Sequence, residues 1–163
     1  MTFAAFRHHT SRDGFEVVFI DGRRFQGQTT GVVDGRPYAV RYAIEVDDAW
    51  RTRRAEVESV VLEGDGEGRW RVNGEPAPEL DGCFDVDLEA SAFTNAFPVA
   101  RDATDAPAAW VRFDLDVVRL EQTYRRSGER TYDYHCPSFD FRSEIVYGED
   151  GVVAEYPGIA TRV

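Results

Sequence analysis

The chain has 163 residues, 42% hydrophobic and 13% aromatic, which is enough apolar surface to fold without disulfides and excludes a disordered acidic tail. Its 19 basic residues, all arginine, against 30 acidic ones give a net charge of −11. A field of this sign repels phosphate backbones and anionic membrane surfaces, so we expect no nucleic-acid partner.

The first fifteen residues, MTFAAFRHHTSRDGF, contain no basic stretch that leads into an apolar run. They are therefore not a secretory signal, and no later segment approaches the ~20 apolar residues that span a bilayer. We expect a soluble, cytoplasmic protein without a membrane span. Residues 1–13, with the adjacent His8 and His9, are a candidate for a disordered N-terminus.

The cysteines and histidines suggest no metal or cofactor site. Cys83 and Cys136 make neither a disulfide framework nor a zinc-ligand spacing, and we expect both to be reduced. His135 has only Cys136 beside it. We therefore predict no metal and no cofactor.

Turn dipeptides punctuate the chain and supply the positive φ angles that tight β-turns require. They are Asp13-Gly14, Asp21-Gly22, Asp34-Gly35, Asp65-Gly66, Asn73-Gly74, Asp81-Gly82 and Asp150-Gly151. Between them the hydrophobic residues recur with period two, which is typical of strands with one buried face. The clearest predicted strands lie in chain order at 37–47, 57–62, 108–118, 132–136, 139–147 and 152–156.

This pattern predicts an all-β protein with little helix. Residues 88–92 and 119–125 are the best helical candidates, but their β-branched and aromatic content favours strand in both. So many strands must curl into a roll or barrel, or stack as a sandwich, because a flat sheet leaves its edges exposed. We predict a single domain over 1–163, a curved antiparallel sheet that forms a roll or open barrel.

The segment DAWRTRRAEV places Arg51 and Arg53 on one strand face, with Trp50 and Arg54 on the other. Arginine pairs bidentately with carboxylates, so Arg51, Arg53 and Arg54 are candidates to pair with Asp85 and Asp87 across the sheet or to present donors to a ligand. A solvated surface ladder is the alternative.

In the segment LDGCFDVDLEASAFTNAFP, Cys83, Asp85 and Asp87 alternate with Phe84, Val86 and Leu88 and so face the opposite way. The polar row meets solvent, lines a pocket, pairs with arginine, or acts as an acid and base pair. A calcium site is a weaker interpretation because the regular Asp-x-Asp-x-Asp-Gly loop is missing.

Several segments together resemble the putative glycolipid-binding family, small microbial proteins, from about Gly31 to the C-terminus. The most specific are the runs at 50–54 and 82–88 and the Thr-Asn pair at Thr94 and Asn95 ahead of Pro98; AAWVRF, EQTYRR, YDY and DGVVAEYPG add to them. The resemblance implies a curved antiparallel β-roll similar in shape to periplasmic carriers of lipoproteins and mycobacterial lipids. Where family members carry two arginines after the Thr-Asn pair, this chain has only Arg101, which weighs against an anion-binding role for that segment.

The resemblance implies a lipid- or glycolipid-binding protein that holds an amphipathic ligand in the groove of the roll, without catalytic residues. We predict that the ligand contacts polar and aromatic side chains from the matching segments. These are Trp50, Arg51, Arg53, Arg54, Asp85, Asp87, Thr94, Asn95, Trp110, Gln122, Tyr124 and Tyr134.

Two other functions remain open from the residues themselves. One is a hydrolase-like enzyme that uses Asp85 and Asp87 as acid and base in a desolvated pocket. The other is an interaction scaffold that uses sheet edges or an aromatic patch. Neither has a sequence motif behind it, because the chain contains no Gly-x-Ser-x-Gly, phosphate-binding loop or dinucleotide fingerprint.

Overall fold

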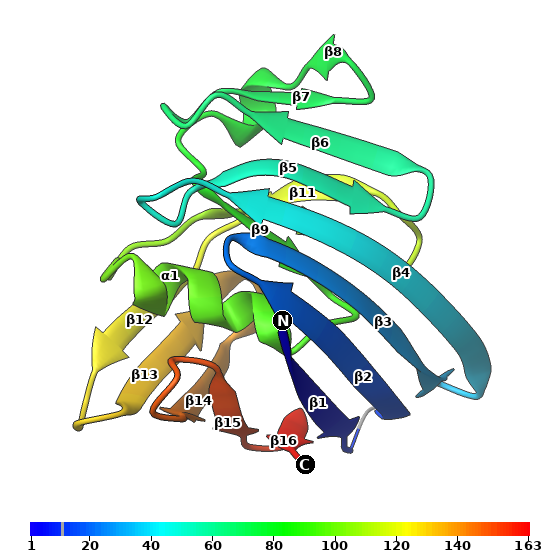
Figure 1. Ribbon diagram of the computed structural model, residues 1–163, viewed down its shortest axis with the longest axis vertical. Coiled ribbons are helices and arrows are strands. Elements are labelled where there is room, and N and C mark those ends of the chain that lie inside the picture. The colour runs from blue at the N-terminus through cyan, green and yellow to red at the C-terminus, as the bar shows by residue number, and fades with distance from the viewer. Residues whose placement is uncertain (11) are drawn as a thin grey trace.

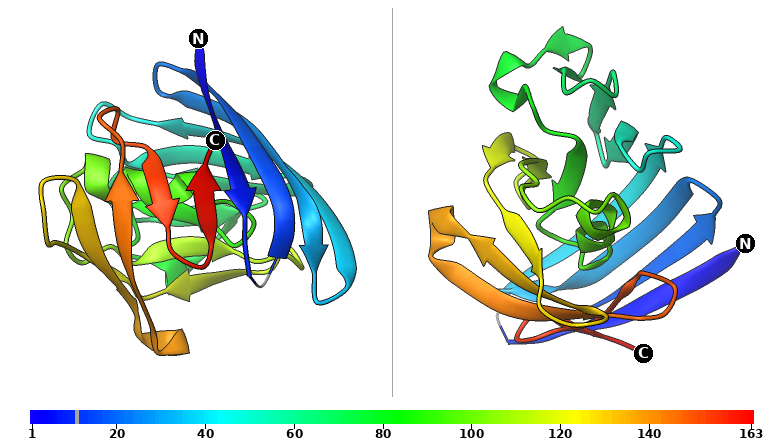
Figure 2. Two further views of the ribbon diagram at one scale, coloured as in Figure 1. Left: turned by 90° about the horizontal axis from the view of Figure 1, so that it is seen from below. Right: turned by 90° about the vertical axis from the view of Figure 1, so that its left-hand side faces the viewer.

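The computed structural model describes residues 1–10 and 12–163 and consists mainly of β-strands (Figure 1). Thirteen strands form one antiparallel sheet, which bends into a trough and does not close into a barrel (Figure 2). The predicted curved roll is confirmed. Along the sheet the strands follow the order β12-β13-β14-β15-β16-β1-β2-β3-β4-β5-β6-β7-β8.

The strands of this large sheet run through the whole chain. They are β1 (Thr2–His8), β2 (Arg12–Asp21), β3 (Arg24–Val33), β4 (Arg36–Val46), β5 (Thr52–Val57), β6 (Val60–Gly64), β7 (Trp70–Val72), β8 (Glu75–Pro76), β12 (Thr123–Arg126), β13 (Thr131–Cys136), β14 (Phe141–Tyr147), β15 (Val153–Tyr156) and β16 (Ala160–Arg162). Because β1 pairs with both β2 and β16, the two halves of the chain meet in the middle of the sheet.

A second layer lies inside the trough, as both views of Figure 2 show. It contains a three-stranded sheet and the short helix α1 (Ala96–Ala100), together with 3-10 turns. The strands are β9 (Asp85–Leu88), β10 (Ala108–Val111) and β11 (Val117–Leu120), and the turns are η1 (Pro78–Leu80) and η2 (Phe93–Asn95). A third turn, η3 (Pro137–Phe139), belongs to the large sheet and joins β13 to β14. None of the helices in the described part of the chain is long and apolar enough to cross a membrane.

The alternation of apolar and polar residues determines which face of the large sheet packs against this inner layer. In β4 the buried side chains are Val40, Tyr42, Ile44 and Val46, and they alternate with the exposed Arg41 and Glu45. A strand presents alternate residues to opposite faces, so the apolar set points into the trough and the charged set points to solvent.

Aromatic side chains join the inner layer to the floor of the trough. Phe25 on β3 lies 5.1 Å from Phe93 on η2 and 5.3 Å from Phe97 on α1, measured between ring centroids. Phe93 and Phe97 themselves meet edge to face at 5.7 Å. All three are buried, and burying each ring stabilises the fold by about 1.5–3 kcal/mol.

The carboxyl group of Glu16 on β2 holds the inner layer by hydrogen bonds. Glu16 is fully buried, and its Oε2 accepts a hydrogen bond from the backbone N–H of Ala92 at 2.9 Å. Its Oε1 accepts from the hydroxyls of Tyr42, at 2.6 Å, and of Ser91. His8 Nε2 lies 3.4 Å from Oε2. One side chain thus connects β1, β2 and β4 to the turn after β9.

Tyr42 reaches Glu16 only because Gly27 on β3 has no side chain. Gly27 stands opposite Tyr42 in the β3-β4 pair, and the tyrosine ring passes over it toward β2. A Cβ atom at Gly27 would lie 2.1 Å from Cζ of Tyr42, far inside van der Waals contact. The glycine is therefore required by a close approach.

The prediction that residues 1–13 are disordered is wrong for Thr2–His8, which form β1. Ala4, Phe6 and His8 are buried, and β1 has a hydrogen-bonded neighbour on each side. His9 follows, with its Nε2 2.9 Å from the Thr161 hydroxyl. Residue 11 lies outside the described residues, and β2 begins at Arg12.

Four predicted strand segments, 57–62, 88–92, 108–118 and 119–125, are interrupted by turns or irregular residues that the alternation does not reveal. Segment 57–62 contains a turn between β5 and β6, where Glu58 has a φ of 51°. Segment 108–118 turns at Leu115, whose φ is 67°, and so becomes β10 and β11. Residues 89–92 form a turn, and 119–125 divide between β11 and β12. Non-glycine residues in left-handed turns carry little sequence signal.

The close approach at Gly27 predicts that Gly27→Ala destabilises the protein by about 2 kcal/mol, because the Tyr42 ring must move away from Glu16. Urea unfolding measures this difference. Gln28→Ala, an exposed change on the same strand, is the control and should stay within about 0.5 kcal/mol of the wild type. Equal unfolding midpoints for Gly27→Ala and the wild type would show that the packing is not needed.

The hydrogen bonds of Glu16 predict that Glu16→Gln lowers the free energy of unfolding by about 3 kcal/mol. The amide has the same shape, but its NH₂ group faces donors and cannot accept from them. Glu56→Gln, at an exposed glutamate of β5, is the matched control and should have little effect. A Glu16→Gln protein as stable as Glu56→Gln would contradict the anchoring role.

Candidate functional site

A pocket of about 280 Å³ lies between the inner layer and the C-terminal strands of the large sheet. Its lining comes from β9 and the turn after it, from β10 and β11, from β13, η3, β14 and β15, and from Arg12 at the start of β2. Pockets of this kind, with an apolar wall and a few polar groups that converge, are typical of small-molecule sites. We call it the inner pocket.

Parallel pairing of β9 with β10 places Asp87 and Trp110 side by side. The two residues stand opposite each other in this pair, so their side chains share one face of the small sheet. Both line the inner pocket. The small sheet thus sets an acidic group beside an indole ring.

The Asp87 carboxylate is held by Thr94. The Thr94 hydroxyl donates to Oδ1 of Asp87 at 2.7 Å and accepts the backbone N–H of Leu88 at 3.3 Å. Asp87 is only 8% exposed, and burial raises the pKa of its carboxyl group, although the hydrogen bond from Thr94 opposes this effect. The Thr94-Asn95 pair therefore fixes a buried acid at the pocket wall.

Buried tyrosines of the large sheet hold Asn95 and Gln122 in place. The Tyr124 hydroxyl donates to Oδ1 of Asn95 at 2.8 Å, and the Tyr147 hydroxyl donates to its backbone carbonyl at 3.0 Å. The Tyr134 hydroxyl donates to Oε1 of Gln122 at 2.9 Å. Burial raises the pKa of each of these tyrosines, which keeps them protonated as donors.

Aromatic rings form most of the remaining wall. Trp110 meets Phe139 edge to face, with 5.5 Å between the ring centroids. Tyr134 makes the same kind of contact with Phe141 at 6.1 Å and with Tyr156 at 5.8 Å. Phe139 is 60% exposed and lies on η3, so it stands at the mouth of the pocket.

Arg12 and Glu89 carry the other charges of the pocket wall. The Arg12 guanidinium donates to the backbone carbonyl of Glu89 and lies 5.5 Å from the ring centroid of Phe113. Oε2 of Glu89 accepts the backbone N–H of Phe113 at 2.9 Å. These contacts tie the start of β2 to the turns that follow β9 and β10.

The structure brings most of the predicted site residues together around the inner pocket. Asp87, Asn95, Trp110 and Tyr134 line it, and Thr94, Gln122 and Tyr124 hydrogen bond to members of that group. These seven residues form one network, although the sequence places them on five separate segments.

Asp85 does not line the pocket. Its carboxylate pairs with Arg101, which follows α1, and the Arg101 guanidinium lies 5.3 Å from the ring centroid of Phe84. The prediction that Asp85 pairs with Arg51, Arg53 or Arg54 is therefore wrong. The segment around Arg101 supplies the partner of Asp85.

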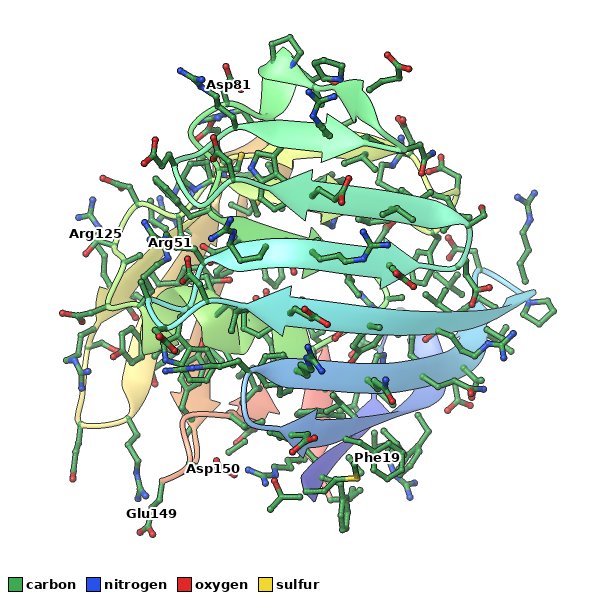
Figure 3. The ribbon with its side chains drawn as sticks, turned by 45° about the horizontal axis from the view of Figure 1, so that its top comes forward. Phe19, Arg51, Asp81, Arg125, Glu149 and Asp150 are labelled. Carbon is green, nitrogen blue, oxygen red and sulfur yellow. The ribbon has the colours of Figure 1, made fainter. Side chains whose placement is uncertain are left out.

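The four predicted residues from Trp50 to Arg54 lie away from the pocket, on the rim and outer face. Arg51 pairs with Asp47 at 2.9 Å, and Arg53 donates to the Gly64 carbonyl. Arg54 pairs with Glu56 and Glu63 on the outer face, and Trp50 lies beneath the Arg23 guanidinium at 4.1 Å. Figure 3 shows Arg51 at the turn that leads into β5. Arg51 and Arg54 thus form ion pairs with acidic residues at the surface, in agreement with the alternative of a solvated surface ladder.

The sequence does not single out Arg12 and Phe139, which line the inner pocket, or Glu16, which anchors the turn beside it. Arg12 lies in the segment that was predicted to be disordered, and Glu16 alternates with apolar residues as an exposed glutamate would. Phe141 and Tyr156 lie in predicted strands but gave no sign of which face they occupy. Only the pairing of distant strands brings these side chains together.

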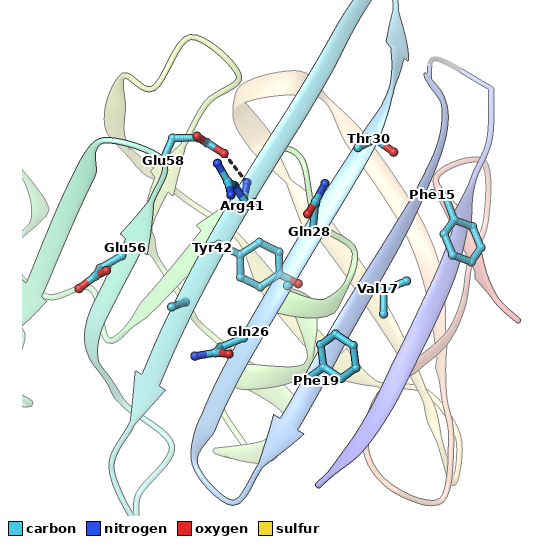
Figure 4. A pocket seen from close by; sticks show the side chains of 12 residues that line it. Phe15, Val17, Phe19, Gln26, Gln28, Thr30, Arg41, Tyr42, Glu56 and Glu58 are labelled. Carbon is cyan, nitrogen blue, oxygen red and sulfur yellow. Dashed lines mark hydrogen bonds between the residues drawn. The ribbon is translucent and has the colours of Figure 1, made fainter.

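A larger, open groove of about 720 Å³ lies on the outer face of β2 to β5 (Figure 4). Phe15 and Phe19 border one side, and Arg41, Glu56 and Glu58 border the other. All five side chains are exposed, and the charged ones meet solvent. The inner pocket is the better candidate because its polar groups are buried and oriented by hydrogen bonds.

The two aspartates do not form an acid and base pair at a common cavity. Asp85 is occupied by Arg101, while Asp87 faces the inner pocket. In residues 1–10 and 12–163, the His, Cys, Asp and Glu side chains make no group of three that could hold a metal ion. The geometry suits binding better than acid and base chemistry.

The environment of Asp85 predicts a pH-dependent stability. Burial raises the pKa of its carboxyl group from 3.8 to about 6, against the opposing charge of Arg101. Between these values the folded state binds the proton more tightly, so this group's contribution is full below 3.8 and is lost as the pH rises through about 6.

Going from pH 7 to pH 4.5 should therefore stabilise the wild type by about 2 kcal/mol more than Asp85→Asn, a difference that urea unfolding at the two pH values measures. The variant serves as its own reference for all other titrating groups. Identical pH dependence in the two proteins would contradict the raised pKa.

Comparison with known proteins confirms the fold and the family resemblance. The chain is similar to a DUF1089 family protein from Pseudomonas aeruginosa, whose crystal structure has a TM-score of 0.84 and 27% identity and covers 96% of this chain and 95% of that one. No curated protein matches the chain. Residues 6–162 match the family described as putative glycolipid-binding. The chain therefore belongs to the putative glycolipid-binding family.

Proposed function

We propose that the protein binds a small amphipathic molecule, a lipid or glycolipid, in the inner pocket and performs no catalysis. The observation that supports this proposal is that the pocket lining has an apolar side and a polar end. Trp110, Phe139 and Phe141 give it an apolar wall, while Asp87 and Asn95 give it a buried polar end. Such a lining suits a molecule with one apolar and one polar part.

The polar end is preorganised. Asp87 is held by Thr94, and Asn95 is held by Tyr124 and Tyr147, so neither side chain has to be ordered when a ligand binds. Preorganised groups lose little conformational entropy on binding and so favour affinity. The family description supports the same class of ligand.

The volume limits how much of the ligand enters. The pocket's 280 Å³ lies just below the range of about 300–1,000 Å³ that is typical of small-molecule pockets. That is enough for one ring or one short chain. The rest of a larger amphiphile would leave past Phe139 and Arg12 at the mouth.

Native mass spectrometry of the protein purified from its own host, followed by denaturing extraction and lipid analysis, tests the proposal. We expect a stoichiometric amphiphile. Trp110→Ala should reduce the bound fraction about tenfold because it removes a wall of the pocket. Trp50→Ala, the same change at a half-buried tryptophan outside the pocket, should retain the amphiphile.

Equal retention by folded Trp110→Ala and Trp50→Ala would place the ligand elsewhere. A host-purified protein without any amphiphile, which also fails to bind octyl detergents in calorimetric titration, would overturn the proposal. Circular dichroism of each variant distinguishes lost binding from lost folding.

A further inference from the structure

We propose that the inner pocket selects amphiphiles whose head group is a cation of the ammonium type, which it holds between aromatic rings and the Asp87 carboxylate. This inference rests on the proposed function and deepens it by naming the head group. The structural basis is an aromatic cage with a buried acid in its wall. The rings of the apolar wall would contact the methyl groups of the ammonium, and the alkyl chain would extend past Phe139 at the mouth.

Five aromatic side chains from five elements surround the pocket. They are Trp110 of β10, Tyr134 of β13, Phe139 of η3, Phe141 of β14 and Tyr156 of β15. The edge-to-face contacts among them turn the rings in different directions around the pocket. A cation within about 6 Å of ring faces is attracted by their quadrupoles, and aromatic cages bind quaternary ammonium groups in this way.

Asp87 supplies the negative charge that such a cage needs. It stands beside Trp110 in the small sheet, and its field helps to raise the pKa of Tyr156, after burial itself. Asp85, two residues earlier, is paired with Arg101, whereas the hydrogen bond to Asp87 comes from the neutral Thr94. In the described residues no arginine lies within ion-pair distance of Asp87.

The charges of the lining favour a cation over an anion. Asp87 and Glu89 carry two negative charges and Arg12 one positive charge, which leaves the lining with a net negative charge. Arg12 already donates to the Glu89 carbonyl and lies over Phe113. The net charge of −11 on the whole chain also attracts cations to the mouth.

With a neutral or anionic head group, Asp87 would have no ion-pair partner in the described part of the chain and only the more distant charge of Arg12 to oppose it. Burial raises the pKa of Asp87, which expresses the cost of an uncompensated charge in the wall. A bound ammonium favours the ionised carboxylate, so binding the cation and ionising Asp87 support each other. A sugar hydroxyl offers a hydrogen bond but no charge.

Three detergents with the same eight-carbon chain test the head group directly in the wild-type protein. They are n-octyltrimethylammonium, n-octyl β-D-glucoside and n-octyl phosphate, each titrated below its micelle concentration by calorimetry. We expect the ammonium detergent to bind at least about tenfold more tightly than the other two. This comparison needs no variant and therefore no assumption about folding.

Variants then test the role of Asp87. Asp87→Asn keeps an oxygen that accepts from Thr94 but removes the charge, and it should weaken ammonium binding about tenfold while octyl glucoside binding changes less than about twofold. Asp85→Asn is the matched control, a buried aspartate of the same strand outside the pocket, and should keep the ammonium preference.

Each failure has a separate meaning. Octyl glucoside or octyl phosphate binding as tightly as the ammonium detergent would overturn the inference and leave the proposed function standing. A folded Asp87→Asn that keeps the full ammonium preference would also overturn it. If none of the three detergents binds and no amphiphile co-purifies, the proposed function itself fails.

Discussion

The buried carboxyl group of Glu16 is the constraint on which the inner layer depends. A carboxylate that leaves water is costly unless donors surround it, and the donors here come from β4 and from the turn after β9. The turn after β9 must therefore keep Ser91 and Ala92 within hydrogen-bond distance of the Glu16 carboxylate. These hydrogen bonds therefore fix the position of the inner layer on the large sheet, while Phe25, Phe93 and Phe97 pack it against the sheet through apolar contacts.

The inner pocket inherits its geometry from this attachment. Asp87 precedes the anchored turn and Thr94 follows it, so the hydrogen bond between them closes a short loop whose middle is fixed to β2. On the opposite side, Tyr124 and Tyr147 fasten Asn95 to the C-terminal strands. The pocket thus lies between the turn anchored to β2 and the segment anchored to the C-terminal strands. These two attachments explain how a thin inner layer can hold the Asp87 carboxylate in a fixed orientation.

Much of the large sheet could be predicted from the sequence, but little of the site. Alternation identifies β4 and β13 because each has one wet face and one dry face. It fails for β9, where all four residues are buried, since that strand is covered on both sides. Glu16 and Arg101 look like surface residues because their partners lie far away in the sequence. The family-like segments predict Asp87, Trp110 and Tyr134, and these three line the inner pocket. The predicted arginines of 51–54 lie outside it, because period two does not say which face of a strand is inside.

The pairing of β1 with β16 also constrains how the molecule can assemble. Phe6 of β1 pairs with Arg162 of β16, so strands from opposite ends of the chain lie side by side in the middle of the large sheet. We call this pairing the central seam. Such a seam closes a very long loop and belongs to the slow, non-local part of folding. Until it closes, β1 to β8 and β12 to β16 are two separate meanders, each with an open edge. The inner pocket draws Arg12 from one and Tyr134 from the other, so its lining is complete only when β1 and β16 have paired.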